Sequence, residues 1–572
     1  MSQQIVRDHN LDALKTAAGW PEADRTTLVT LATVLAATGA DDEGRVFFDA
    51  LAARQPDRPL PLALAGYFQV RAGADVEAGV ARLNDAASRD LGPAQYYRGL
   101  ALAGLPAEAG HAEQAVADLE FVLAVRDQFP SNMIRAVYHG LAAAYTATGR
   151  DDLAAKAAAY SGLSSAPAQA RLQFAGGWAN PADGYRFTSP RLVELMPGVT
   201  LAQGYDFGDF AFVRTASGVV AIDSGTSERR VAAALTAAGL RAEDVSHVIL
   251  THAHFDHAGG AGALTGSQTQ VIAQAGFPSE LDRQHANPIP FRYFTGAVAD
   301  ALPPHVTVNV LIAEQTKLSI GGTEFVLYPA TGGETSDALM VYLPASGVLF
   351  AGDVMMPYLG APFFAEGSPD GLLEALALIT EIDPRVLVHG HTTLTELFKP
   401  DVIPGLRAAL TELRDQTLAG IARGLALTAL LKANVLPDVL REHPAAVNPY
   451  LVTRDHFVQR LHHQHSGYWK SDGQGLEPYD PSDRAAALDL LADGRPERFA
   501  SAARTLLAQR DPALALEIVN AGLAAHPEAI ELPQLRQQAL YRLMERHQLQ
   551  DPFRFLIYAE LAGAELAPVA PK

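Results

Sequence analysis

One short segment concentrates side chains that bind metal ions. The run THAHFDHAGG, residues 251–260, holds three histidines and one aspartate. It follows the apolar stretch HVIL, which predicts a strand, so we expect His252 and His254 to point the same way and to share one ion. Asp256 and His257 then reach a second ion. Imidazole and carboxylate ligands without thiolate suit Zn²⁺, iron or Mn²⁺, and a solvated polar loop is the alternative.

Three further motifs occur in the chain in the same order as the motifs of a known superfamily. They read GVVAIDSGT, LFAGDVM and VLVHGHTTL. Together with residues 251–260 they resemble the metallo-β-lactamase superfamily. The resemblance implies that Asp353 bridges two metal ions and that Asp223 orients a ligand from behind the site. It also implies that the last ligand is His391, with His389 as the alternative.

The loop YPATGGETSDALMVYLP departs from the common superfamily pattern, which has a histidine here. Glu334 is the ligating side chain at this point, as in the alkyl sulfatase branch, and a solvated loop glutamate is the alternative. The resemblance implies two metal sites: His252, His254 and Glu334 in the first, and Asp256, His257 and His391 in the second, with Asp353 bridging. Two ions about 3.5–4 Å apart can share a water and lower its pKa towards about 7, which provides a hydroxide nucleophile. Asp256 and Asp353 are therefore the candidate catalytic carboxylates, and two Zn²⁺ ions are the first choice of cofactor.

Two segments are candidates for substrate contact. HANPIPFRYFTGAVADAL is similar to an alkyl sulfatase segment near the substrate, which makes Arg292 the candidate for contact with an anion, a surface charge being the alternative. After Asp353 the chain reads MMPYLGAPFFAEGSPDG, apolar and aromatic with no basic group, where alkyl sulfatases have a polar, sulfate-holding segment. Tyr358 and Phe363, with neighbouring methionines and Phe364, are expected to form an apolar substrate wall or simply to pack in the core.

The elements around these motifs predict three domains. Residues 1–170 are rich in Ala and Leu and repeat a helix, glycine turn and helix at Gly39, Gly73, Gly110 and Gly149, spacings of 34, 37 and 39 residues. That is close to the tetratricopeptide period, although a plain helical bundle is the alternative. Residues 171–400 alternate strands and helices, which indicates an α/β or αββα sandwich.

The last predicted domain, residues 401–572, is helical and amphipathic. Its motifs DQTL and GYWKSDGQ resemble the dimerisation domain of alkyl sulfatases, which implies a homodimer. The predicted fold class is therefore α+β and multidomain: a metallo-β-lactamase sandwich between tetratricopeptide-like helical repeats and a helical dimerisation domain. A histidine cluster in this domain is expected to be a packed or solvated helix face and not a metal site: His456, His462, His463 and His465.

The amino-acid composition limits the classes of binding partner. The 572 residues carry a net charge of −20, which argues against binding of nucleic acid, since that needs a basic face. There is no cysteine, so disulfides and thiolate ligands are excluded. The sequence shows neither a signal peptide nor a long apolar run, and we expect a cytoplasmic protein without a membrane span.

The motifs together predict a dinuclear metallohydrolase that cleaves an alkyl sulfate-type ester with an apolar part. One alternative is a hydrolase of the same fold acting on another ester, a lactone, a thioester or a phosphoester. An alternative of another class is an interaction protein that recruits a protein partner through its N-terminal repeats and keeps a residual metal site.

Overall fold

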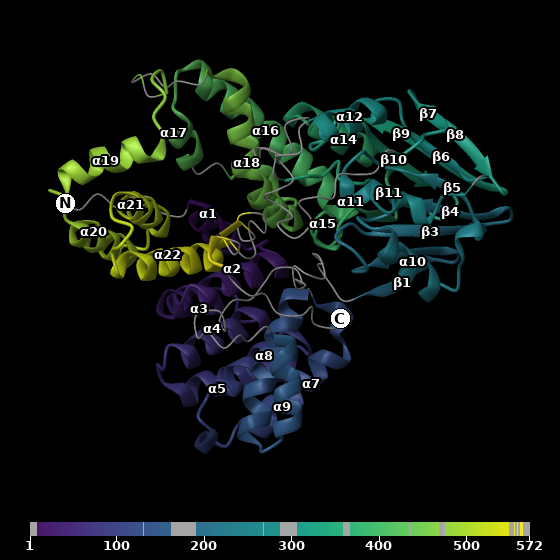
Figure 1. Ribbon diagram of the computed structural model, residues 1–572. Helices are drawn as coiled ribbons and strands as arrows, with labels where there is room; N and C mark the ends of the chain where they lie inside the picture. Colours follow the sequence, from purple (N-terminus) through teal and green to yellow (C-terminus); the bar gives the residue numbers. More distant parts are fainter. Residues whose placement is uncertain are drawn as a thin grey trace.

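The computed structural model describes residues 9–129, 131–161, 190–266, 268–286, 306–357, 367–433, 436–467, 473, 475–547, 554, 557–558 and 561–563. Helices fill the N-terminal part: α1 (His9–Ala18), α2 (Arg25–Ala37), α3 (Asp41–Arg54), α4 (Pro59–Arg71), α5 (Val76–Arg89), α6 (Pro93–Ala103), α7 (Ala112–Ala124), α8 (Ser131–Ala147) and α9 (Asp151–Ser161). Figure 1 shows α3 to α9 stacked below the rest of the molecule, with α1 and α2 above them, beside α21 and α22.

The glycines of the sequence repeat lie between consecutive helices. Gly39, Gly73, Gly110 and Gly149 have φ values of 66°, 66°, 74° and 72°. This left-handed conformation costs glycine little, because glycine has no Cβ, and it reverses the chain after a helix. The helical hairpins therefore form where the sequence predicts them, and their assignment to the tetratricopeptide class stays a prediction.

Two sheets form the central part. The first sheet has seven strands in sequential order: β1 (Arg191–Met196), β2 (Val199–Gln203), β3 (Phe210–Thr215), β4 (Gly218–Ile222), β5 (Val245–Ile249), β6 (Gln270–Gln274) and β7 (Val310–Ile312). The second has the order β12 (Val386–Val388), β11 (Val348–Phe350), β10 (Ala338–Leu343), β9 (Thr323–Ala330) and β8 (Thr316–Ile320). Pairs from β4 to β7, and the pair β11 and β12, are parallel, and the other pairs are antiparallel.

The sheets pack face to face, and each outer face is covered by helices. A buried core between the sheets contains Ile222, Ile249, Phe325 and Val341. The outer face of the first sheet packs against α10 (Glu228–Ala237) and α12 (Phe277–Ala286). The outer face of the second packs against α14 (Pro369–Ile382) and α15 (Thr392–Leu397). The predicted αββα sandwich is confirmed.

A layer of longer helices joins the sandwich to the N-terminal part. It is built from α16 (Ile403–Ala422) and α18 (Val447–His465), beside α17 (Leu427–Lys432). α14 packs against both α16 and α18, and α18 also contacts α1 and α2. Figure 1 shows α16 and α18 between the sandwich and the other helices. One continuous hydrophobic core therefore runs from α14 through α16 and α18 into the N-terminal helices.

The chain continues into a helical group at the side: α19 (Pro481–Leu491), α20 (Pro496–Ala508), α21 (Pro512–Ala525) and α22 (Glu531–His547). α22 contacts α2, so this group also meets the N-terminal helices. No helix in the described part of the chain is both long and apolar enough to span a lipid bilayer.

Candidate metal centre

Side chains of the candidate centre come from five loops at the edge of the sandwich. Asp223 follows β4, residues 251–257 follow β5, Glu334 lies between β9 and β10, Asp353 follows β11 and His391 follows β12. Where the chain leaves β4, Asp223 has a φ of 60°, a left-handed conformation that Asp accepts better than most residues. All seven candidate ligands are buried: His252, His254, Asp256, His257, Glu334, Asp353 and His391.

The first group consists of His252, His254 and Glu334. Strand alternation, from which we expected both side chains to point the same way, does not reach the two histidines, because β5 ends at Ile249 and they lie in the following loop. The loop nevertheless brings them together. His252 Nε2 and His254 Nδ1 each lie 3.3 Å from Glu334 Oε2. One atom from each residue falls within 4.8 Å of the other two, a spacing that a single cation could bridge.

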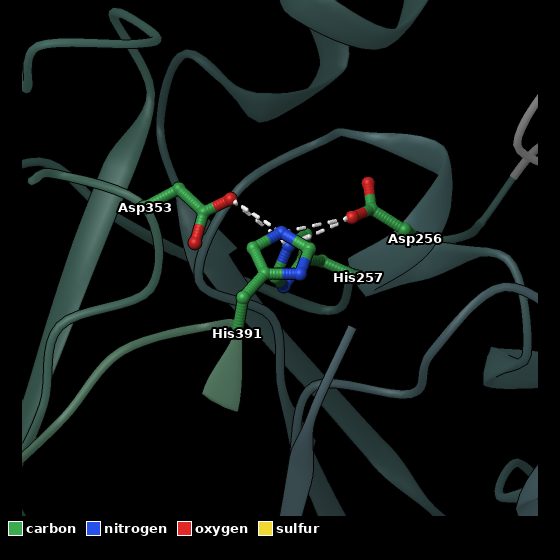
Figure 2. A group of neighbouring side chains, drawn as sticks. All are labelled: Asp256, His257, Asp353 and His391. Carbon is green, nitrogen blue, oxygen red and sulfur yellow. Dashed lines mark ion pairs between the residues drawn. The ribbon is translucent and has the colours of Figure 1, made fainter. Parts of the chain in front are cut away.

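The second group consists of Asp256, His257, Asp353 and His391. Asp256 and His257 belong to the short helix α11 (Phe255–Ala258). His391 Nε2 lies 3.2 Å from Asp256 Oδ2 and 3.0 Å from Asp353 Oδ2. His257 Nε2 lies 3.4 Å from each of the same two oxygens. Figure 2 shows the two carboxylates on opposite sides of the two imidazoles.

The two groups are adjacent. The ring centroids of His252 and His257, one from each group, are 4.2 Å apart. Among the described residues these two are the groups of His, Asp and Glu able to hold a metal ion. The two groups therefore form one continuous cluster of candidate ligands, in which Asp353 belongs to the second group.

Hydrogen bonds fix the tautomer of two histidines. His257 Nδ1 lies 2.9 Å from Asp223 Oδ2, and His391 Nδ1 lies 3.0 Å from the carbonyl oxygen of Phe207. A carboxylate and a carbonyl only accept, so both Nδ1 atoms carry the proton. Each Nε2 is then left with a lone pair directed at the centre, the form that binds a metal ion.

His252 is held in the same way through Thr251. Thr251 donates its hydroxyl to Asp223 Oδ2 over 2.8 Å, so its oxygen accepts from His252 Nδ1 at 3.0 Å. Asp223 therefore orients one histidine of each group. Sequence analysis missed Thr251, although its place directly before the first histidine was a usable signal.

Asp337 is a second residue that sequence analysis missed. Its Oδ2 accepts from the backbone N–H of Ala253 over 3.0 Å, and its Oδ1 accepts from Thr335 over 2.7 Å. Asp337 thus ties the loop between His252 and His254 to the loop that carries Glu334. Its position three residues after Glu334 was the available signal.

The nitrogen and oxygen atoms that could ligate a metal fit a divalent cation. Four of them are buried and have no hydrogen-bond partner among the described residues: His252 Nε2, His257 Nε2, Glu334 Oε2 and Asp353 Oδ1. Burying such atoms without partners costs about 1–3 kcal/mol each, so partners are expected for them. Imidazole nitrogens and carboxylate oxygens converging on one point are typical of zinc or a related ion.

The ionisable side chains of the second group shift one another's pKa values. Burial disfavours the charged form, but Asp256, Asp353 and Asp223 nevertheless raise the pKa of His257 well above its ordinary value. His391 behaves in the same way beside Asp353 and Asp256. Against their own burial, the pKa values of Asp256 and Asp353 are held low by these two histidines. This pocket thus favours positive charge, which a divalent cation supplies in place of the protons.

Two glycines allow the backbone to approach the centre. A Cβ on Gly390 would lie 2.3 Å from His257 Cε1 and 2.4 Å from Asp353 Oδ1. A Cβ on Gly208 would lie 2.2 Å from the carbonyl oxygen of Asp256. Both contacts are far closer than real side chains make, so the loops that follow β12 and precede β3 need glycine here.

Other predicted residues lie elsewhere or outside the described residues. His389 is buried but turned away, with Nε2 3.0 Å from the carbonyl oxygen of Phe398. Met355 and Met356 are buried in the hydrophobic core on the outer side of the second sheet. Arg292, Tyr358, Phe363 and Phe364 lie outside the described residues. The histidines of α18 form no metal-binding group within the described part of the chain.

Fold and site together define a class of protein, and comparison with known families gives the same class. Residues 204–391 match the model of the Metallo-beta-lactamase superfamily. This stretch is about a third of the chain and runs from the end of β2 to the last candidate ligand. The chain therefore contains a metallo-β-lactamase domain, flanked by helical regions on both sides.

Within that class, the chain is similar to alkyl sulfatases. It is 25% identical over 169 residues to a linear primary-alkylsulfatase of Pseudomonas sp., across 28% of this chain and 32% of the relative. It is 28% identical over 164 residues to a hydroxyacylglutathione hydrolase of Rhodobacter capsulatus, across 28% of this chain and 54% of the relative. The chain thus matches about a third and about half of the lengths of these two relatives.

A solved structure shows how far the likeness in fold extends. The stereoselective inverting sec-alkylsulfatase of Pseudomonas sp. superposes with a TM-score of 0.55 and 20% identity. The superposition covers 65% of this chain and 66% of that one. It therefore includes more than the metallo-β-lactamase domain, and helical elements outside residues 204–391 share the fold of the alkyl sulfatase.

Proposed function

We propose that this chain is a dinuclear metal-dependent hydrolase that cleaves an alkyl sulfate-type ester. The observation that carries the proposal is the pair of adjacent, buried ligand groups in a metallo-β-lactamase domain. The similarity to a primary and a secondary alkylsulfatase supports the substrate class.

Each ligand has a role in this proposal. His252, His254 and Glu334 would hold the first ion, and Asp256, His257 and His391 would hold the second, with Asp353 as the carboxylate shared by both sites. Zn²⁺ ions bound there would activate a water and polarise the ester. Asp223 keeps the proton on Nδ1 of His257 and, through Thr251, on Nδ1 of His252, so that both Nε2 lone pairs stay available. Contacts of Arg292, Tyr358 and Phe363 with the sulfate and the alkyl chain remain part of the proposal.

A thioester or another ester is the second candidate substrate. The similarity to a hydroxyacylglutathione hydrolase favours it, and so does the segment after Asp353, which has no basic residue to hold a sulfate.

A substrate panel separates these candidates. Protein loaded with Zn²⁺ is assayed with decyl sulfate, 2-octyl sulfate, an S-acyl glutathione and an aryl phosphate. We expect the highest kcat/KM for an alkyl sulfate, and a preference for the thioester would move the function to the second candidate. Glu334→Ala should lower kcat/KM by more than about 100-fold, because it removes a ligand. Its control is Glu324→Ala on β9, where the surface pair with Lys317 contributes about 0–1 kcal/mol at most.

We also propose that the protein is a homodimer. Large apolar side chains are exposed in and before α19, a placement that suits an interface: Leu476, Tyr479, Leu490 and Leu491. One chain has a mass of 60.8 kDa, and multi-angle light scattering should give twice this value. The mass of a monomer would contradict the proposal.

An interaction through the N-terminal helices is the alternative of another class. A cleft of ≈ 1090 Å³ lies between α2, α4 and α6 on one side and α20 to α22 on the other. Arg71, Tyr97 and His139 are among the residues that line it. Purified protein that binds no Zn²⁺, Mn²⁺ or iron would favour this alternative over the hydrolase.

A further inference from the structure

The loop that carries Glu334 contacts residues 367 and 368, which lie directly before α14. A Cβ on Gly367 would lie 2.2 Å from the carbonyl oxygen of Gly333 and 2.6 Å from the backbone nitrogen of Glu334. The backbone of Gly367 therefore rests directly on the peptide bond that leads into Glu334. Next to it, the N–H of Ser368 donates to the carbonyl oxygen of Gly332 over 3.3 Å. The position of residues 367 and 368 thus sets the position of the Glu334 backbone.

A side chain from the helical layer stabilises this contact. Arg460, in the second-last turn of α18, donates from Nη2 to the carbonyl oxygen of Gly367 over 2.8 Å. Arg460 is partly buried, and α18 packs against α14 alongside it. A hydrogen bond from a guanidinium is stronger than one between neutral groups. Through Arg460, a helix outside the metallo-β-lactamase domain is thereby linked to a candidate metal ligand.

We propose that Arg460 is a positioning residue for Glu334. This inference rests on the proposed function, since it assumes that Glu334 binds a metal ion. Arg460 fixes the carbonyl of Gly367, Gly367 fixes the peptide before Glu334, and the carboxylate of Glu334 then meets His252 and His254. Ligand distances in well-formed metal sites lie within about 0.2 Å of their standard values, so we expect a small shift of this peptide to weaken binding.

Other contacts limit the size of the effect. Asp337 holds the same loop from the other side through Ala253, and Ser336 donates to Glu280 of α12 over 3.1 Å. Loss of Arg460 therefore leaves the loop in place but looser. Residues that orient metal ligands typically contribute 10–100-fold to metal affinity, and Arg460 acts one contact further out. We expect about a 10-fold loss of Zn²⁺ affinity at the first site.

The test compares two substitutions at one position in the full-length protein. Arg460→Met keeps the apolar stem and removes the donors, whereas Arg460→Lys restores one donor. Zn²⁺ affinity and stoichiometry are measured by competition with a chromogenic chelator. We expect Arg460→Met to weaken one of the two Zn²⁺ ions about 10-fold and Arg460→Lys to recover most of that loss. If Arg460→Met does not fold, Arg460→Gln replaces it, because its amide is too short to reach Gly367.

Arg414→Ala is the matched control. Arg414 of α16 also reaches the first turn of α14, with Nη1 3.5 Å from Asp370 Oδ1, but Asp370 is 71% exposed. This exposed ion pair contributes little, so Arg414→Ala should bind both ions as the wild type does.

A double-mutant cycle locates the effect. Arg460→Met is combined with Glu334→Gln, which weakens the first site, and with Asp256→Asn, which weakens the second. If Arg460 acts through Glu334, its substitution changes nothing further in the Glu334→Gln protein and keeps its 10-fold effect in the Asp256→Asn protein. Equal effects in both proteins would overturn the inference. If the wild type binds two ions and Arg460→Met binds both equally well, this inference alone is overturned. If the wild type binds no ion, the proposed function is overturned.

Discussion

At the scale of single residues, Asp223 organises the centre without facing it. Its two oxygens accept from His257, from the Thr251 hydroxyl and from the Thr251 N–H, and all three contacts are buried. One carboxylate thereby sets the tautomer of a histidine in each ligand group. The negative charge also makes both imidazoles better electron donors.

Asp223→Asn tests this role. Asn fits the left-handed backbone, but its NH₂ group replaces one of the two oxygens that accept from Thr251 and His257, so an acceptor is lost together with the charge. We expect Zn²⁺ affinity and kcat/KM to fall by about 10–100-fold with little change in fold, measured by chelator competition and steady-state kinetics. The control is Asp383→Asn, an exposed aspartate with a φ of 48°, which should behave as the wild type.

His389 should make stability depend on pH. Burial lowers the pKa of His389 from 6.5 to about 4. The unfolded chain therefore takes up a proton at a higher pH than the folded chain, and stability contributed by neutral His389 is lost as the pH falls from about 6.5 to 4. The full loss is about 3 kcal/mol.

The measurement is urea unfolding of metal-free protein between pH 7.5 and 4. His389→Gln can keep the hydrogen bond to Phe398 but cannot titrate, so its unfolding free energy should fall less over this range. An identical pH dependence in both proteins would contradict the assignment.

At the scale of elements, the positions of the candidate ligands depend on where the strands end. β4, β5, β11 and β12 all release the chain at the same edge of the sandwich, and the turn between β9 and β10 reaches that edge as well. The loops are short and pass close to one another, which is why glycine is needed after β12 at position 390. The strands thus position the ligands, and small residues permit the contact between loops.

Gly390→Ala should damage the centre more than the fold. The added methyl group would clash with His257 and Asp353. Overpacking of this kind typically lowers the free energy of unfolding by about 1–3 kcal/mol. We expect Zn²⁺ affinity to fall by roughly 100-fold, since two ligands must move. Gly104→Ala at the end of α6 is the control, because its Cβ would meet its nearest atom at 3.5 Å. Normal Zn²⁺ binding by Gly390→Ala would show that the loops have more freedom than their contacts indicate.

At the scale of the whole molecule, the helical regions pack against one another and against the sandwich. A single core joins the N-terminal helices to α14, α16 and α18. Trp20, directly after α1, is buried in this core, and the guanidinium of Arg441 lies 4.5 Å from its ring centroid. The N-terminal helices and the sandwich should therefore stabilise one another.

Trp20→Ala tests this coupling. Removing a buried tryptophan typically costs 3–5 kcal/mol, and Arg441→Ala should cost only about 0.5–1 kcal/mol, because Arg441 is partly exposed. Both losses are measured by urea unfolding. Trp20→Ala should also lower the temperature at which bound Zn²⁺ is released, and release at the wild-type temperature would show that the N-terminal helices unfold independently.

Much of the fold was predictable because its signals are local. Alternating apolar strands, glycine turns between helices and amphipathic stretches each lie within some 10–20 residues, and they gave the sandwich and the helical hairpins. The strand alternation that we applied to His252 and His254 does not extend to them, because an apolar run does not reveal where a sheet ceases to pair. The boundaries of the three domains stay predictions, and the shared core shows how closely these parts pack.

The sequence by itself determined the types and the order of the candidate ligands, because histidine and carboxylate at these spacings suit few purposes other than binding metal. The tertiary structure decided which of them meet. It turns His391 towards the second group and His389 towards Phe398, presents His254 through Nδ1, and brings Asp223 to two histidines. It also brings Arg460 to Gly367, 93 residues away in the chain. Such contacts join segments that are distant in sequence and depend on how sheets and helices pack, which no local pattern encodes.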